Sequence, residues 1–185
     1  MKINLKPKAY LYPMPVIIVG TYDEDGTPNA MNAAWGTVCD ENRIAVVLSA
    51  THKTVKNLLK SKAFTIAMAD KNNLVSADYV GIVSGNEVKD KIQKSGWTTT
   101  KAQHVNAPII NELPLTMELK LISYDFETEI CIGEVVNVVA DESIITDKKI
   151  DLNKYMPILY DCDGHGYYTI GEKVGNAFCD GKKLK

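Results

Sequence analysis

The sequence predicts a mainly β protein with short helices, arranged as an antiparallel barrel. The first observation behind this prediction is that at least six strand-like runs are separated by turns or short helical segments, without a regular alternation of strand and helix. The second is that no Gly-x-Gly-x-x-Gly follows a strand, so the doubly wound dinucleotide fold gains no support. The third is size, because 185 residues that are 45% hydrophobic suit one domain over residues 1–185.

The first half of the chain opens with a predicted hairpin. The apolar run Val16–Val19, bounded by a proline and a glycine, is typical of a buried strand. The turn signal 23–26 ends in a glycine that tolerates positive φ. A second strand is expected from about Asn29 to Thr37, and a third over 44–48.

Three helices and a strand are expected in the following segment. Thr51 is a candidate N-cap for a helix that runs to about Lys60. Helical spacing places four apolar residues on its core side: Val55, Leu58, Leu59 and Ala63. We expect a strand over 64–68, a short helix over 74–83 and an exposed helix over 87–94.

The second half of the chain returns to strands. Residues 115–121 alternate apolar with polar side chains, the period of a strand with one wet face. A partner strand follows over 130–136, and a last strand over 167–170. Residues 141–157 are mostly polar and are expected to form a loop. No internal repeat or domain boundary is evident.

Composition narrows the classes of partner. A formal net charge of -2 gives no general case for nucleic acid or an anionic membrane surface. No apolar run approaches the roughly 20 residues that a bilayer requires, and the N-terminus lacks a signal-peptide core. We therefore expect a cytoplasmic protein. The four cysteines are widely spaced, so reduced and mostly structural thiols are expected.

Two segments could hold a phosphorylated aromatic ligand. The helix start at 49–54 combines hydroxyls, Lys53 and free N–H groups, which favour a bound phosphate. The alanines within 29–35 leave room for a flat ring near the backbone, and Asn29 adds a donor and an acceptor. Taken alone, each segment is explained better by ordinary structure: a capped helix, and a strand of small residues with Trp35 as a core aromatic.

The two segments in this order resemble the flavin reductase-like, FMN-binding split-barrel family, in its flavoredoxin branch. The resemblance covers nearly the whole chain. It rests on an ordered set of motifs: residues 15–21 with 25–26, 29–36, 52–54, Phe64, Ser84-Gly85 followed by Asp90-Lys91, 107–108, 132–135, and Tyr168 with Gly171.

The resemblance implies a split β-barrel of Greek-key type that forms a homodimer and holds FMN near the subunit interface. It implies two sets of contacts and one further cation. The isoalloxazine would be lined by Asn29, Ala33, Ala34 and Trp35. The phosphate would be held by Ser49, Ala50, Thr51, Lys53 and Thr54. Lys91 would lie near the flavin or its phosphate, although a solvated lysine on an exposed helix is the alternative.

Some positions fall outside this pattern. Relatives often carry a histidine five residues before the Gly-Glu-Val motif, where this chain has Thr128, which cannot titrate near neutral pH. Cys39 follows residues 29–35, the segment expected to hold the ring. It is expected to be structural, with thiol exchange as the alternative. His165 lies near Cys162 and two aspartates, but it has no second ligand pair, so a solvated loop is expected and no metal site.

The implied function is an FMN-dependent oxidoreductase that takes electrons from NAD(P)H or a protein donor and passes them through the flavin N5 to a small acceptor. No catalytic side chain is expected, because the chemistry belongs to the cofactor. A non-catalytic FMN electron carrier is the alternative. A structural barrel without cofactor is the third hypothesis.

Overall fold

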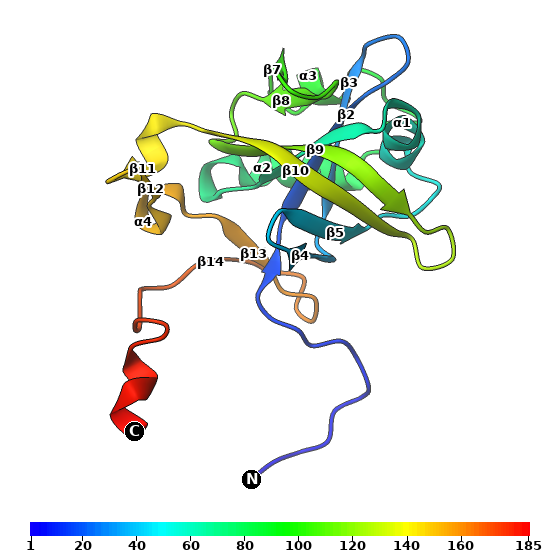
Figure 1. Cartoon of the computed structure of the whole chain (residues 1–185). Coiled ribbons are helices and arrows are strands. Elements are labelled where there is room, and N and C mark those ends of the chain that lie inside the picture. The colour runs from blue at the N-terminus through cyan, green and yellow to red at the C-terminus, as the bar shows by residue number, and fades with distance from the viewer.

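A curled antiparallel sheet of seven strands forms the body of the protein in the computed structural model, which describes residues 1–185 (Figure 1). The strand order across this sheet is β3-β2-β6-β9-β10-β5-β4. The strands are β2 (Ile17–Tyr22), β3 (Pro28–Ala33), β4 (Gly36–Asp40), β5 (Arg43–Val47), β6 (Ala63–Met68), β9 (Leu115–Tyr124) and β10 (Ile130–Ala140). The predicted split barrel is confirmed, and all seven strands pair antiparallel with their neighbours.

A two-residue link closes the barrel. β3 ends at Ala33 on one edge of the sheet, and β4 begins at Gly36 on the other edge. Three Cα–Cα steps span at most about 11 Å, whereas the edges of a flat seven-stranded sheet lie about 29 Å apart. The sheet must therefore curl until its edges meet. The expected single strand from Asn29 to Thr37 is wrong for this reason, since the chain changes edge at Ala34 and Trp35.

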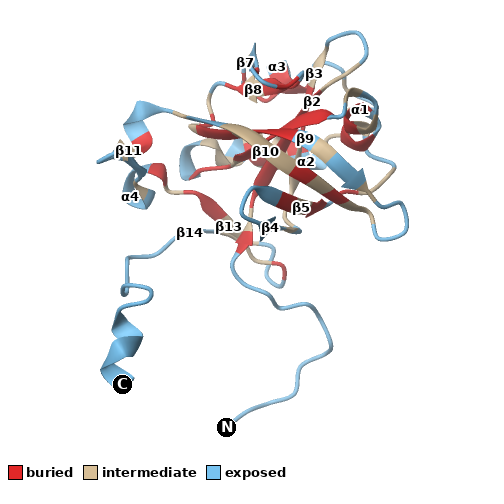
Figure 2. Cartoon of the chain, in the orientation of Figure 1, coloured by how far each residue is buried: buried red, intermediate tan, exposed pale blue.

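Both faces of the central strands are buried (Figure 2). On β2, Ile17 and Val19 face the barrel interior with Phe64 and Leu119. Ile18 on β2 and Val16 just before it belong to a second cluster, which also holds buried residues of α2 and α3. Two-sided burial explains why 16–19 is a continuous apolar run with no alternation.

The chain has four short α-helices: α1 (Lys53–Ser61), α2 (Leu74–Ile82), α3 (Lys91–Lys94) and α4 (Leu152–Tyr155). α1 buries Val55 and Leu58 against the barrel interior, as the spacing predicts. α2 packs on β3 and corresponds to the short helix expected there. No helix in the structure has the length and apolar character that crossing a membrane would need.

Two sequence expectations for helices and loops are wrong. The exposed helix over 87–94 is only one turn, α3, and both Lys91 and Ile92 on it are buried, because α3 packs against β3 and the cluster around Trp97. The expected loop 141–157 contains short elements: the 3-10 turn 142–144, the strands β11 (Ile145–Thr146) and β12 (Lys149–Ile150), and α4. Their local bonds are side-chain caps from Asp141 and Asp151, which an apolar period cannot reveal.

The remaining strands form small sheets beside the barrel. β7 (Thr99–Lys101) pairs with β8 (Pro108–Ile110). β1 (Met14–Pro15), β13 (Ile158–Tyr160) and β14 (Tyr167–Thr169) form a three-stranded sheet. β14 was expected, but β13 was not, since a three-residue strand gives almost no periodic signal. Figure 1 shows both chain termini projecting from the body beyond this sheet.

Candidate functional site

A cavity of about 180 Å³ lies between β3, the start of α1 and α3. It is lined by Asn29, Met31, Asn32, His52, Lys53, Thr54, Lys91 and the segment 80–85. The charged or titratable side chains in this lining are His52, Lys53 and Lys91, and none of the lining residues is acidic. The cavity is therefore electropositive and suited to an anion.

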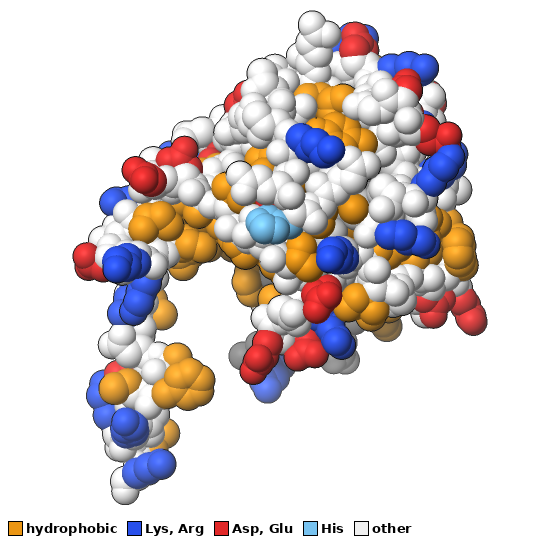
Figure 3. Space-filling view, turned by 45° about the horizontal axis from the view of Figure 1, so that its top comes forward, with side chains coloured by type: hydrophobic (Ala, Val, Ile, Leu, Met, Phe, Trp, Pro, Cys, Tyr) orange, Lys and Arg blue, Asp and Glu red, His pale blue; other side chains and the backbone are white.

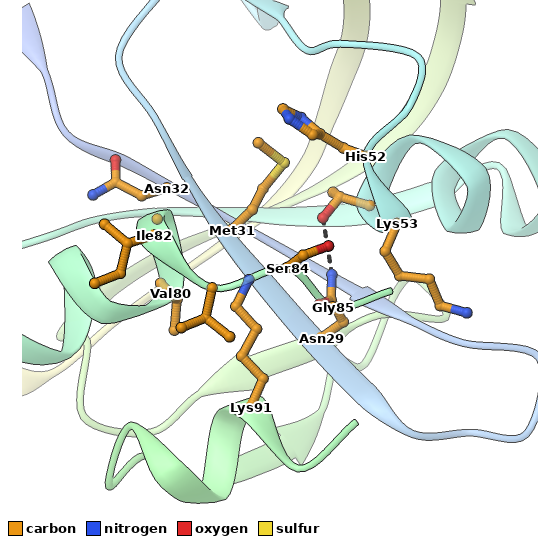
Figure 4. A pocket seen from close by; sticks show the side chains of 13 residues that line it. Asn29, Met31, Asn32, His52, Lys53, Val80, Ile82, Ser84, Gly85 and Lys91 are labelled. Carbon is orange, nitrogen blue, oxygen red and sulfur yellow. Dashed lines mark hydrogen bonds between the residues drawn. The ribbon is translucent and has the colours of Figure 1, made fainter. Parts of the chain in front are cut away.

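Lys91 is the most unusual residue of this cavity. Its side chain rises from α3 toward β3 (Figure 4), and the residue is only 3% exposed. Burial lowers the pKa of Lys91 from 10.5 to about 8. Every ion pair of the chain involves other residues. A buried ammonium without a counter-charge is costly, so an anionic or hydrogen-bond-accepting ligand would be favoured beside it.

Asn29 forms the floor of the cavity with one unused acceptor. Its Nδ2 donates to Thr54 Oγ1 at 2.9 Å, which ties β3 to the start of α1. Its Oδ1 is buried and has no donor in this chain. A Cβ on Gly85 would come within 2.2 Å of that Oδ1, so glycine is required for the segment 84–85 to pass beside Asn29. A ligand N–H or hydroxyl would satisfy the orphaned oxygen.

The N-terminus of α1 is open on the same cavity. Its N-cap is His52, which makes no side-chain capping bond, so the expected cap at Thr51 is wrong. Thr51 instead exchanges a hydroxyl hydrogen bond with Ser49 at 3.2 Å. The N–H groups of Lys53 and Thr54 have no acceptor in the chain, and they add to the positive end of the helix dipole.

The ammonium of Lys53 points away from the cavity (Figure 4) and pairs with Asp23 of the β2–β3 turn. The hydrogen bond from Lys53 holds the pKa of Asp23 below its usual range. Lys53 therefore lines the cavity with its backbone and the first carbons of its side chain, and not with its ammonium. Lys91 supplies the cation without an ion-pair partner there.

A second cavity, of about 300 Å³, adjoins the first and is mainly apolar. It is lined by Ala33, Ala34, Trp35, Val47, Asp78, Tyr160 and Tyr167, and it shares Met31, Asn32, His52, Gly81 and Ile82 with the first cavity. Trp35 packs beside Tyr160 with ring centroids 6.4 Å apart, and Tyr160 beside Tyr167 at 6.0 Å. The Tyr167 hydroxyl donates to Asp78 at 2.7 Å.

The structure thus brings seven of the ten sequence-predicted residues to two adjoining cavities. Asn29, Lys53, Thr54 and Lys91 line the polar cavity, and Ala33, Ala34 and Trp35 line the apolar one. Ser49, Ala50 and Thr51 precede α1 and line neither cavity. The Ala50 N–H is already used, because it donates to Glu129 at 2.8 Å.

Other positions from the sequence lie elsewhere. Thr128 is exposed in the β9–β10 turn, where its N–H donates to Asp125. Cys39 is an exposed free thiol on β4, and it lines neither cavity. His165 is engaged by Tyr160 through a hydrogen bond of 2.8 Å.

Sequence reasoning missed the part of the site that α2 and β13 contribute. Gly81, Ile82, Asp78 and Tyr160 reach the cavities only because the fold lays α2 on β3 and β13 beside the link at 34–35. His52 is not among the predicted site residues, although it borders both cavities. Its position directly before Lys53 was the available signal.

Two solved structures superpose on nearly the whole chain. Flavoredoxin of Desulfovibrio vulgaris (Miyazaki F) superposes with a TM-score of 0.93 at 38% identity, covering 98% of this chain and 100% of that one. Flavoredoxin from Methanosarcina acetivorans superposes with a TM-score of 0.90 at 25% identity, covering 100% of both chains. An uncharacterized protein of Bacillus subtilis (strain 168), YdfE, is 24% identical and covers 95% of this chain and 92% of its own.

The family comparison agrees with these superpositions. The model of the flavin reductase like domain matches residues 9–168, which includes every residue of the two cavities. The chain therefore belongs to the flavin reductase like family.

Proposed function

We propose that the chain is an FMN-binding oxidoreductase of flavin reductase or flavoredoxin type, built as one domain. The observation that carries this proposal is the buried ammonium of Lys91, unpaired within the chain, beside the open N-terminus of α1. An anion with an aromatic ring attached fits the pairing of one electropositive and one apolar cavity. The 38% identity to a flavoredoxin supports the same assignment.

The residues present fit FMN in three respects. The free N–H groups of Lys53 and Thr54 suit a phosphate, with Ser49 and Thr51 hydroxyls close by in sequence. Ala33 and Ala34 offer a small-residue wall for the isoalloxazine, and Trp35 adds an aromatic side chain beside it. The cavities of about 180 and 300 Å³ together reach the usual size of small-molecule sites, which is roughly 300–1,000 Å³.

FMN, when bound, supplies the redox chemistry by accepting and passing hydride or electrons at N5. The chain's own residues need only bind and tune it. Asn29 offers its orphaned Oδ1 as an acceptor. Lys91 offers a positive charge that favours negative charge on the ligand, since electrostatic attraction is strong where water is excluded. No side chain in the cavities has to act as a general acid or base.

A non-catalytic FMN electron carrier remains the alternative, because the same cavities would serve it equally well. A barrel that binds no flavin is the third hypothesis. We further propose a homodimer in the cytoplasm, as the resemblance and composition lead us to expect, with NAD(P)H or a redox protein as the electron donor.

Anaerobic mixing of the FMN-loaded protein with NADH or NADPH separates these hypotheses. We expect the flavin absorbance to bleach at about 1 s⁻¹ or faster with at least one nucleotide, in the range of ordinary enzyme turnover. Flavin that is bound but not bleached by either nucleotide would favour the carrier. A colourless protein that takes up no added FMN would contradict both.

Replacing Lys53 and Thr54 together by alanine should weaken FMN binding by about 1–3 kcal/mol, because Asp23 loses its counter-charge and Asn29 loses the hydroxyl that holds it in the cavity, while the backbone N–H groups remain. The measurement is fluorescence titration of the cofactor-free protein with FMN.

Lys60→Ala is the matched control for this double variant. Lys60 lies on the same helix and pairs with Glu24 as Lys53 pairs with Asp23, but it does not line either cavity. We expect Lys60→Ala to leave the dissociation constant for FMN unchanged. An unchanged constant for the double variant would show that neither the ion pair with Asp23 nor the bond from Asn29 to Thr54 supports the site.

Lys91→Met should make the cofactor-free protein more stable at neutral pH, by about 1–3 kcal/mol, because it removes an unpaired buried charge. The folded pKa of Lys91 is about 8 against 10.5 for an exposed lysine. Between these values the unfolded chain binds more protons, so the free energy of unfolding of the native chain rises with pH. Below about pH 8 Lys91 is charged in both the folded and the unfolded chain, so the full free-energy cost of burying its charge remains.

Chemical denaturation of the native chain and Lys91→Met, from neutral pH to about pH 10, measures this difference. The rise in the free energy of unfolding with pH should be absent from Lys91→Met. Lys94→Met is the control, since Lys94 is exposed on the same turn and pairs with Asp90. Equal stability of the native chain and Lys91→Met at every pH would show that Lys91 carries no burial cost.

A further inference from the structure

Asp78 is the only acidic residue in the lining of the apolar cavity, and no lysine or arginine lines that cavity. Asp78 takes part in none of the ion pairs of the chain. Its side chain accepts one hydrogen bond, from the Tyr167 hydroxyl. Burial and this hydrogen bond raise the pKa of Tyr167 to about 12, so the phenol stays neutral. The apolar cavity therefore holds a carboxylate without a counter-charge.

Three aromatic side chains line the same cavity as Asp78: Trp35, Tyr160 and Tyr167. Neighbouring rings are tilted by 54° and 52°, so they stand as walls rather than as a stack. Both phenol hydroxyls are already bonded, that of Tyr167 to Asp78 and that of Tyr160 to His165, which does not line the cavity. The two tyrosines therefore offer a ligand mainly their rings, whose faces attract cations.

The C-terminal end of α2 adds to the negative potential of this cavity. Gly81 and Ile82, the last two residues of α2, belong to its lining, and Asp78 lies one turn before the end of the helix. The C-terminus of a helix carries partial negative charge, which favours a cation nearby. The polar cavity with Lys91 favours an anion, so the two adjoining cavities favour ligand groups of opposite charge.

The apolar cavity is open to solvent. Two of its lining residues are largely exposed, Trp35 at 56% and Ile82 at 75%. Tyr167 begins β14, which leads into the C-terminal segment, and Figure 3 shows hydrophobic side chains bordering the hollow between that segment and the body. A second molecule can therefore reach the aromatic rings from outside.

We propose that the apolar cavity binds a weakly hydrated organic cation, a pyridinium or a quaternary ammonium ion, between the three aromatic rings and Asp78. The rings contact the apolar body of the cation, and the carboxylate supplies its counter-charge. A small inorganic cation is not favoured, because apolar walls cannot replace its water. This charge preference belongs to the chain without flavin. That the cation binds beside the flavin, as its redox partner, rests on the proposed function.

Two pairs of probes with matched shape measure the charge preference. N-methylpyridinium is compared with toluene, and choline with its analogue in which carbon replaces the nitrogen. Chemical-shift titration of the full-length, cofactor-free protein is run at about pH 8 and about 0.15 M salt, where histidine is ordinarily neutral and distant charges are screened. We expect at least one cation to bind about 10-fold or more tightly than its neutral partner. The pair with the larger ratio identifies the kind of cation.

Asp78→Asn removes the charge but keeps an oxygen that can accept the hydrogen bond from Tyr167. It should weaken binding of the cation about 10-fold and leave binding of the neutral probe unchanged. Trp35→Leu keeps an apolar wall without a ring face, and it should weaken cation binding about 3-fold more than neutral binding. Asp163→Asn is the matched control, because Asp163 is an exposed acid outside the cavity, and it should change neither. Denaturation curves check that each variant folds.

Equal affinities within both probe pairs would overturn the cation site, and so would an Asp78→Asn variant that keeps the native preference. Titration of the FMN-loaded protein decides whether cation and flavin share the site. A cation that binds with flavin in place supports the shared site, whereas a cation that competes with FMN would contradict it. A native chain that binds no FMN would refute the proposed function, while the probe pairs would still decide the charge preference of the cavity.

Discussion

The two-residue link at Ala34 and Trp35 is the constraint on which the rest of the structure depends. It joins the two edges of the seven-stranded sheet, so the sheet has to close into a barrel. The Val47 N–H donates to the Trp35 carbonyl at 2.8 Å, which extends the β4–β5 ladder into the link. The same closure places Ala34 and Trp35 near His52, which leads into α1, since all three line the apolar cavity. The site is therefore a consequence of how the barrel closes.

Electrostatics divides this site into two unlike halves. The polar half carries the buried Lys91 and the open end of α1 without an acidic residue in its lining, and the apolar half is walled by aromatic side chains. The unpaired cation costs stability in the cofactor-free protein, and the proposed ligand would offset that cost when it binds. Loss of stability at an unloaded site is the expected counterpart of affinity for an anion.

The sequence predicted the fold class, most strands of the barrel, and seven residues that reach the cavities. β2 was found as a continuous apolar run because both of its faces are buried, and β9 was found by its alternation of apolar and polar residues. The break at Ala34 was missed, since a sheet edge has no local signature. Burial of Lys91 was missed as well, because Lys91 is covered by α3 packing on β3, a contact between segments far apart in the chain. Ile82 and Tyr160 were beyond reach for the same reason.

Comparison of FMN with riboflavin as ligands of the native chain tests the central claim most directly, since the two differ only in the phosphate. If the electropositive cavity holds that phosphate, FMN should bind at least about 30-fold more tightly, as expected for contacts of 2 kcal/mol or more. Fluorescence titration of the cofactor-free protein gives both dissociation constants. Equal dissociation constants for the two ligands would contradict the assignment of the cavity beside α1 and Lys91 as the phosphate site.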